Sequence, residues 1–265
     1  MGLFVVFAIW LLMVAMNFSY LSSTGLLVLN LKSAKIFSKD LHKSVQTDKI
    51  LSNKECLYWS NRVRQMKDKW NKRNVSMNTL GSASYLDLNH EELSFESNQL
   101  LKPFDLLNEK VRSYLESKLK QKVVFRDGCC KPGFHIFECN SIFSYPVASV
   151  HKDMQYQRLK YYEDEEIDTD NLLSFTLPIE LPKKAGLFLF DTEVPAWSMY
   201  FFPKILWFNF CNKVYVPYKE GEIVMHKGLD FHMIGPSEIN TEKYRMTLQG
   251  HGVFDRKNKV WHLYW

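Results

Sequence analysis

The segment VASVHKDMQYQ contains a histidine, His151, and an aspartate, Asp153, two residues apart at the end of an apolar run. An imidazole and a carboxylate at this spacing can bind the same metal ion. They can equally be two polar residues at the point where a strand reaches water, because so short a motif often occurs by chance. A third ligand on an element that folds back beside the pair would separate the two interpretations.

Two histidines further along the chain, His226 and His232, flank the predicted turn KGLD and are candidates for that third ligand. Two imidazoles and one carboxylate on one face of a metal ion leave its other coordination positions open. This ligand set suits non-haem Fe(II) and O2 chemistry, although a zinc hydrolase can use the same residue types.

Arg245 lies 13 residues after His232, in the predicted strand YRMTLQGHG. Strand alternation places the polar side chains of this segment on one face and its apolar side chains on the other. A polar row that points into a β-sandwich is unfavourable unless a polar partner lies there. A guanidinium pairs with a carboxylate through two parallel hydrogen bonds, so a dicarboxylate cosubstrate with its other end on the metal would satisfy it. The polar face consists of Arg245, Thr247, Gln249 and His251.

Together these motifs resemble the metal and cosubstrate motifs of the Fe(II)/2-oxoglutarate-dependent dioxygenase superfamily. They are His151-x-Asp153, His232 and Arg245-x-Thr247. The similarity covers roughly residues 120 to 265, and the phrases PGFHIF, SFTLPIELP and RMTLQGHGV are also similar to uncharacterised oxygenase-like proteins. The fold that the resemblance implies is a double-stranded β-helix, a cupin-like jelly roll.

The resemblance also implies a role for each residue. Fe(II) would be held by His151, Asp153 and His232. Arg245 and Thr247 would hold the distal carboxylate of 2-oxoglutarate. The shorter path to Arg245 favours His232 over His226 as the third ligand, so His226 becomes a residue that supports the site or faces the substrate. Further candidates for a supporting role are Gln249 and His251.

The reaction implied is hydroxylation of a substrate with O2, Fe(II) and 2-oxoglutarate, releasing succinate and CO2. Desaturation and demethylation remain open, whereas the carboxylate ligand Asp153 disfavours halogenation. Two other classes remain as alternatives. A cupin-type metalloenzyme that uses no keto acid would not need Arg245, and a non-catalytic jelly-roll binding module would use its histidines and aspartate only structurally.

The elements that must position these residues change character near residue 122. Residues 122 to 265 contain about nine short segments rich in Val, Ile, Phe, Tyr and Thr, which predict an antiparallel jelly-roll domain. Residues 32 to 121 are basic at their start and have a helical pattern. Trp59, Val63, Met66 and Trp70 form one apolar stripe on a predicted helix of about 20 residues, and a second helix is predicted from about Pro103. The predicted fold class is therefore mainly β with flanking N-terminal helices.

Residues 1 to 31 carry no charged side chain and are predicted to form a signal-anchor or single transmembrane segment. The segment from Lys32 to Arg73 contains 12 lysines or arginines and four acidic residues. Basic residues after a span favour the cytoplasmic side and anionic lipid, so the catalytic domain is expected there. Nucleic acid is disfavoured as a partner because no nucleic-acid-binding module accompanies the charge.

The composition constrains the function less than the motifs do. The chain of 265 residues is 46% hydrophobic and 15% aromatic, which is ample for a core, and its five cysteines lack C-x-x-C spacing, which argues against a disulfide framework or a zinc ribbon.

The substrate is left open between a small molecule, a lipid-like molecule and a protein. The acidic segment 161 to 171 could meet a basic substrate or be a solvated loop, and the aromatic segment 194 to 210 could line an apolar pocket.

Overall fold

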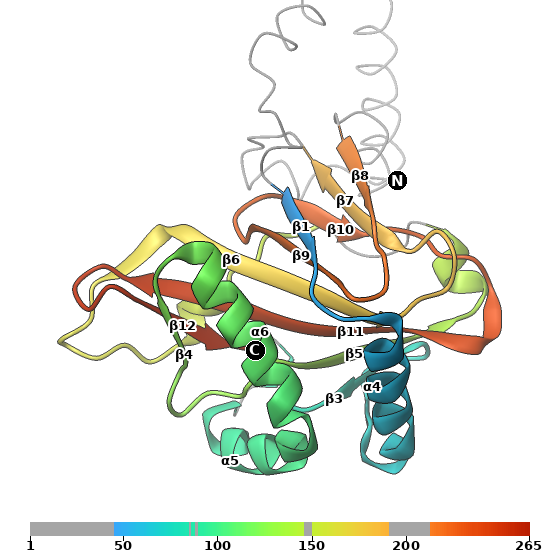
Figure 1. The fold of residues 1–265 in the computed structure, drawn as a ribbon, viewed down its shortest axis with the longest axis horizontal. Coiled ribbons are helices and arrows are strands. Elements are labelled where there is room, and N and C mark those ends of the chain that lie inside the picture. The colour runs from blue at the N-terminus through green and yellow to red at the C-terminus, as the bar shows by residue number, and fades with distance from the viewer. Residues whose placement is uncertain (1–44, 85, 88–89, 146–149, 191–212) are drawn as a thin grey trace, which may run out of the picture. The chain divides into compact units, whose positions relative to one another are not determined.

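The longest strand of the computed structural model, β11 (Asn240–Asp255), lies in the middle of its main sheet (Figure 1). It pairs antiparallel with β5 on one side and with β6 on the other, and β12 continues the β5 side. The sheet extends from β6 through β9 to β1, and from β5 through β3 to β2, while β4 pairs parallel with β12. The strands are β1 (Val45–Lys49), β2 (Asn71–Lys72), β3 (Met77–Leu80), β4 (Lys122–Phe125), β5 (Gly133–Cys139), β6 (Ile167–Glu180), β9 (Glu222–Lys227) and β12 (Val260–Tyr264).

A smaller antiparallel sheet has the strand order β10-β7-β8. Its strands are β7 (Gly186–Phe190), β8 (Lys213–Pro217) and β10 (His232–Ile234). Leu187 and Leu189 of β7 pack in one apolar cluster with Val224 of β9. The two sheets therefore form a β-sandwich, and β10 brings His232 to its interior.

The structure describes residues 45–84, 86–87, 90–145, 150–190 and 213–265, all of which belong to one compact unit, Leu41–Trp265. In these ranges no helix is both long and apolar enough to cross a membrane. The predicted anchor, residues 1 to 31, and the aromatic segment 194 to 210 lie outside the described residues. The membrane expectation therefore stays a prediction.

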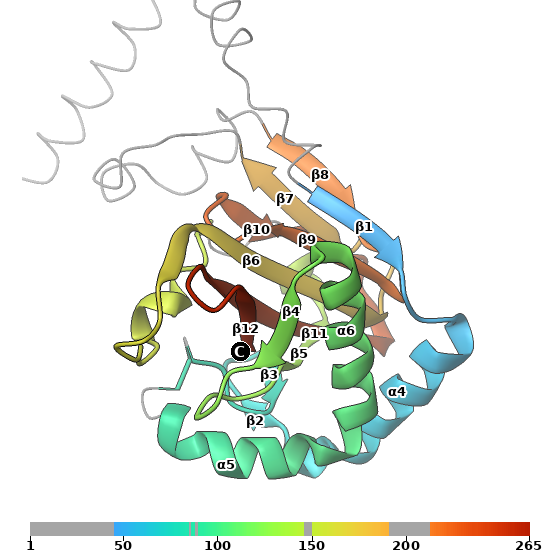
Figure 2. The ribbon, with the colours of Figure 1, turned by 60° about the vertical axis from the view of Figure 1, so that its left-hand side comes forward.

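In the described part of the chain, three α-helices cover the face of the main sheet that is turned away from the small sheet (Figure 2). They are α4 (Asn53–Gln65), α5 (His90–Leu101) and α6 (Asp105–Leu119). The short 3-10 helix η1 (Lys67–Lys69) follows α4, and η2 (Lys102–Phe104) joins α5 to α6. A capping box starts α4, because the Ser52 hydroxyl accepts from the Glu55 backbone and the Glu55 carboxylate accepts from the Ser52 backbone. Lys120, in the left-handed region at φ 54°, ends α6.

Strand alternation separates the two faces of the main sheet. Phe134, Leu177 and Leu248 are fully buried on the helix side, against Val63 of α4 and Leu115 of α6. Each such side chain contributes about 1.5–3 kcal/mol by its burial. Alternate residues of the same strands, among them His135, Thr176 and Thr247, point to the other side, so the sheet separates the apolar helix-side core from an interior that contains many polar side chains.

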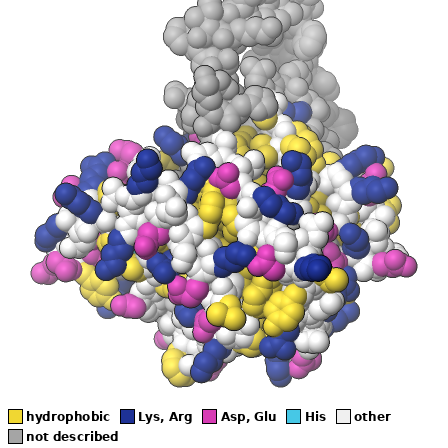
Figure 3. Space-filling view, viewed as in Figure 1, with side chains coloured by type: hydrophobic (Ala, Val, Ile, Leu, Met, Phe, Trp, Pro, Cys, Tyr) yellow, Lys and Arg dark blue, Asp and Glu magenta, His cyan; other side chains and the backbone are white. Residues whose placement is uncertain are grey.

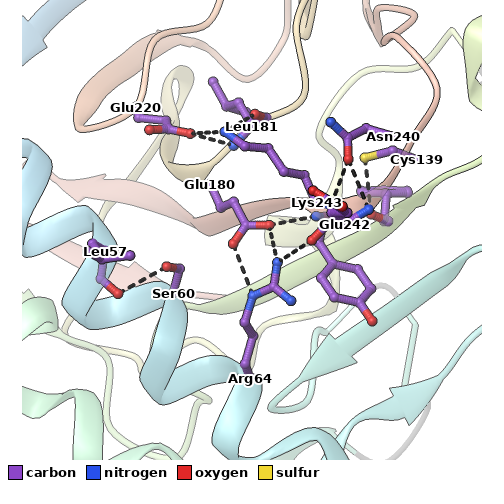
Figure 4. A network of polar contacts seen from close by, with 12 residues as sticks. Leu57, Ser60, Arg64, Cys139, Glu180, Leu181, Glu220, Asn240, Glu242 and Lys243 are labelled. Carbon is purple, nitrogen blue, oxygen red and sulfur yellow. Dashed lines mark hydrogen bonds and ion pairs between the residues drawn. The ribbon is translucent and has the colours of Figure 1, made fainter.

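A partly buried ion pair fixes α4 to the sheet (Figure 4). Arg64 donates to both oxygens of Glu180, at 3.1 and 2.6 Å, and to the backbone carbonyl of Glu242. Glu180 also accepts from the backbone amide of Tyr244. The solvent-facing surface of the helix side carries basic and acidic side chains interspersed (Figure 3), which is typical of a solvated face.

The N-terminal third differs from its helical expectation. Its described part adds β1, β2 and β3 to the main sheet, and α4 is shorter than the apolar stripe suggests. Trp70 lies beyond the helix in extended backbone, where its indole donates to the carbonyl of Val63 at 3.0 Å. The helical spacing of Trp70 thus reflects packing on the same core rather than one continuous helix. The start of a second helix near Pro103 agrees with η2 and α6.

Candidate metal centre

The backbone itself brings His151 and His232 together. The two residues form an isolated antiparallel bridge, with N–O distances of 3.0 and 2.9 Å, at the end of β10. Their ring centroids are 4.4 Å apart. Asp153, two residues on, is tied to the turn after β9 because its amide donates to the Gly228 carbonyl at 2.7 Å. The turn that separates His226 from His232 therefore also positions the carboxylate.

Three ligand atoms converge at this point. Nε2 of His232 lies 3.5 Å from Oδ2 of Asp153, and Nε2 of His151 lies 3.9 Å from Oδ1. All three donors lie within 4.8 Å of one another. Asp153 and His232 are buried, while His151 is partly exposed. Two imidazole nitrogens and one carboxylate oxygen at these separations can share one divalent ion and leave part of its coordination sphere open.

The protonation states fit that role. The Nδ1 of His232 donates to the carbonyl of Asp230 at 2.9 Å, since a carbonyl can only accept, and this leaves the Nε2 lone pair directed at Asp153. Burial lowers the pKa of His232 to about 3, so the ring is neutral near pH 7. Burial alone raises the pKa of Asp153, but the surrounding imidazoles outweigh it and hold that pKa far below its usual range. Neutral imidazole and ionised carboxylate are the metal-binding forms.

A chain of hydrogen bonds orients Asp153 from behind. The Ser174 hydroxyl on β6 donates to Oδ2 at 2.6 Å, and Nε2 of Gln155 donates to Oδ1 at 3.2 Å. Because the single hydroxyl proton of Ser174 is given to Asp153, Nδ1 of His251, 3.1 Å from Ser174 Oγ, is the donor in that contact. Each oxygen of the carboxylate thus has one protein donor and retains a lone pair for a metal.

His226 lies beside the ligands without being one of the three. Its ring is 4.6 Å from that of His232, and its Nδ1 donates to the Lys227 carbonyl at 3.1 Å. The register of the main sheet explains its place, because His226 pairs with Ser174 and Ser174 pairs with His251 across three neighbouring strands. His226 therefore faces the same interior as the supporting hydrogen-bond chain.

The predicted anion-binding residues lie deeper. Arg245 is buried, and its guanidinium donates to the carbonyls of Gly235 at 2.9 Å and Gly186 at 2.8 Å, which are neighbours at one end of the adjacent strands β10 and β7. The guanidinium carbon of Arg245, Cζ, lies 5.1 Å from the ring centre of Tyr218. Among the described residues no carboxylate pairs with it, although a buried cation without an anion is costly. Thr247 is also buried and accepts from Gln249 at 3.2 Å.

A cavity of about 900 Å³ opens over the three ligands. Tyr218 and Thr176 line it on the side of Arg245. The Tyr218 hydroxyl interacts with Thr176 and with Arg245. Arg245 and Thr247 do not themselves line the cavity, so any ligand there would meet Tyr218 and Thr176 first. Gln249 and His251 do line it, together with His135 of β5.

Sequence reasoning missed several of these residues. Ser174 and Thr176 alternate with Phe175 and Leu177 in SFTLPIEL, and that alternation of polar and apolar positions was a usable signal. Tyr218 offered none, because it follows β8 in a turn whose path depends on the tertiary fold.

A second group of potential ligands, Glu165, Asp255 and His262, does not have the character of a metal site. Arg126 already binds both oxygens of Glu165, at 2.9 and 2.8 Å. Asp255 caps its own turn by accepting from the amides of Glu166, Lys257 and Asn258. These carboxylates are occupied by protein donors and serve structure.

No protein-family model matches the chain, and no curated protein matches it by sequence. Solved structures do match by fold. The non-haem α-ketoglutarate-dependent epimerase SnoN from nogalamycin biosynthesis is similar with a TM-score of 0.50 and 11% identity, over 80% of this chain and 78% of that one. An N-substituted L-amino acid dioxygenase from Burkholderia ambifaria, in complex with α-ketoglutarate, gives 0.50 and 9%, over 83% and 86%.

These likenesses identify the fold as the one found in non-haem Fe(II)/2-oxoglutarate-dependent enzymes, as the sequence motifs predicted. The mainly β architecture with antiparallel sheets agrees with that assignment.

Proposed function

We propose that this chain is a non-haem Fe(II)/2-oxoglutarate-dependent oxygenase that hydroxylates its substrate. The observation that carries the proposal is the convergence of His151, Asp153 and His232 at the base of a cavity large enough for a cosubstrate and a substrate. Solved enzymes of the same fold include structures with α-ketoglutarate bound, which supports the choice of cosubstrate.

The residues present fit the metal. His151, Asp153 and His232 would hold Fe(II), with His232 fixed by the Asp230 carbonyl and Asp153 fixed by Ser174. When bound, Fe(II) with 2-oxoglutarate and O2 supplies the oxidation, in which 2-oxoglutarate becomes succinate and CO2 as a substrate C–H bond is hydroxylated. The protein contributes orientation of the ligands and the cavity that lies over them.

Arg245, Tyr218 and Thr176 are suited to the distal carboxylate of 2-oxoglutarate. Arg245 supplies a buried positive charge that no described carboxylate neutralises, and the two hydroxyls provide hydrogen bonds at the cavity wall. In this arrangement Arg245 acts partly through Tyr218, which differs from the direct pairing expected from the motif.

A zinc hydrolase fits the cavity less well. Such an enzyme needs a general base beside its metal-bound water, and the typical base is a carboxylate that is not a ligand. Among the described residues that line the cavity, Asp153 is the acidic one, and it belongs to the metal set. A cupin-type enzyme without a keto acid would leave the buried charge of Arg245 without a use.

The test is succinate release from 2-oxoglutarate by the anaerobically purified full chain in lipid nanodiscs, supplied with Fe(II) and then O2. Asp153→Ala should abolish release, and Arg245→Lys should raise the 2-oxoglutarate concentration needed. Arg256→Lys is the matched control, because Arg256 is an exposed arginine that pairs with Asp168 far from the cavity.

Tight coupling to a missing substrate could suppress succinate release. The anaerobic Fe(II)–keto-acid absorption band is therefore measured in parallel. Absence of both succinate and the band from the wild-type protein would refute the oxygenase proposal.

A further inference from the structure

Basic side chains outnumber carboxylates in the described lining of the cavity. Apart from Asp153, the described lining contains no carboxylate, whereas it includes Lys152 and Arg158. Lys152 lies between the ligands His151 and Asp153, and Arg158 lies at the end of the 3-10 helix η4 (Gln155–Arg158), which follows them. The cavity entrance thus has a positive charge that its own walls do not neutralise.

Neither basic residue is in an ion pair within the described part of the chain. Arg158 donates through Nη1 to the carbonyl of Ser84 at 3.1 Å, and the Lys152 ammonium lies 4.6 Å from the ring centre of Phe231. Five other described arginines have carboxylate partners, and these pairs are Arg64–Glu180, Arg73–Asp87, Arg112–Glu116, Arg126–Glu165 and Arg256–Asp168. Arg158 is held in place by a backbone carbonyl while its charge remains available.

Part of the cavity wall is apolar and open to solvent. Val75 is 75% exposed and Ile142 is 46% exposed, and both line the cavity. Met77 and Phe143 lie in the same two segments and line it as well. Exposed apolar side chains gathered around a cavity are typical of a binding surface that a ligand covers.

The cosubstrate does not account for this charge. Under the proposed function, 2-oxoglutarate carries two negative charges, one placed at the metal and one near Arg245. Lys152 and Arg158 therefore remain for the molecule that is oxidised.

We propose that the substrate is an organic anion with an apolar body, whose carboxylate or phosphate group is received by Arg158 and whose body covers Val75 and Ile142. This inference rests on the proposed function, because it assigns the substrate of the same cavity. It also decides against the amine-bearing substrate that the acidic segment 161 to 171 suggested. No residue of that segment lines the cavity, and Glu165 and Asp168 are already paired with arginines.

The test uses four probes with one phenylbutyl body, namely 4-phenylbutyrate, 4-phenylbutyl phosphate, 4-phenylbutanamide and 4-phenylbutylamine. Dissociation constants are measured by ligand-observed NMR on the metal-free full chain in neutral nanodiscs. We expect at least one anion to bind about tenfold more tightly than the neutral amide, and the amine to bind most weakly. The tighter of the two anions identifies the preferred group.

Arg158→Glu should abolish or reverse the preference for anions, and Arg158→Gln should remove most of it. Lys160→Glu makes the matched charge change at an exposed residue of the same segment that does not line the cavity. It should leave the preference unchanged. Loss of the preference in Arg158→Glu, in which Arg245 is intact, excludes binding of the probes at Arg245 as the explanation. Equal binding of amide and anions, or an anion preference that survives Arg158→Glu, would overturn the inference.

Because the binding measurement requires no metal, its result is separable from the oxygenase test. A selective anion site in a chain that forms no succinate would refute the proposed reaction alone. Succinate formation without anion selectivity would refute the substrate class alone.

Discussion

The change Ser174→Ala removes one oxygen atom and tests whether the buried hydrogen-bond chain supports the metal centre. The hydroxyl lies 2.6 Å from Asp153 and 3.1 Å from His251, and all three side chains are buried. A hydrogen bond to a charged group contributes about 1.5–3 kcal/mol. Part of that loss is recovered when the metal itself orients the carboxylate, so we expect a decrease in metal affinity of about 10- to 100-fold, the range typical of groups that support a metal ligand.

The assay is calorimetric titration of Mn(II), a redox-stable substitute for Fe(II), into metal-free protein at pH 7.5. Ser60→Ala is the control, because Ser60 is a buried serine on α4 whose hydroxyl donates to the Leu57 carbonyl, on the helix side of the sheet. Both variants should be folded, and Ser60→Ala should bind Mn(II) as the wild type does. If Ser174→Ala binds within twofold of the wild type while Asp153→Ala does not bind, the reasoning about the supporting chain is wrong.

Three further changes test other parts of the structure. Gly228→Ala would place a Cβ 2.9 Å from the Ser174 hydroxyl and 3.3 Å from the Asp153 Cβ, so it should weaken Mn(II) binding at least tenfold; unchanged affinity would contradict this. Phe134→Ala removes a fully buried ring packed on Phe104 and should lower the free energy of unfolding by about 3–5 kcal/mol in urea titrations, and a loss under 1 kcal/mol would show that the core is packed differently. Burial lowers the pKa of His135 to about 3, below its value of 6.5 in the unfolded chain, so metal-free protein should lose stability as pH falls from 6.5 towards 3, by up to ~1.4 kcal/mol per pH unit for this residue. His135→Gln should reduce that slope in urea midpoints measured between pH 6.5 and 4.5, and an identical slope would contradict the assignment.

Local patterns predicted the elements that carry the site. The alternation of YRMTLQGHG predicted one polar face, and in the structure Gln249 and His251 share the cavity while Met246 and Leu248 lie in the helix-side core. A third ligand for His151 and Asp153 could be sought at His226 or His232, because these two histidines flank a single predicted turn. Choosing His232 over His226 required the family resemblance, since sequence spacing does not specify which histidine crosses to the small sheet.

Long-range geometry accounts for what the sequence did not predict. Arg245 was expected at the cavity wall, but the carbonyls of Gly186 and Gly235 hold its guanidinium behind Tyr218. Those carbonyls belong to segments that approach β11 only in the folded state. The strands of the N-terminal third were missed for a similar reason, because β1 is short and finds its partner, β9, more than 170 residues later.

The central position of β11 has a consequence for how the chain is made. β5 and β6 are synthesised before β11. In the folded sheet β11 lies between them, so one edge of β5 and one edge of β6 remain unpaired until residues 240 to 255 are in place. Until then a growing chain exposes two unpaired strand edges, which are sites of aggregation. His251 and Ser174, on β11 and β6, meet only at that insertion. The growing chain is therefore most exposed to aggregation until β11 is made, and the proposed metal site gains its full hydrogen-bond support only after that strand has left the ribosome.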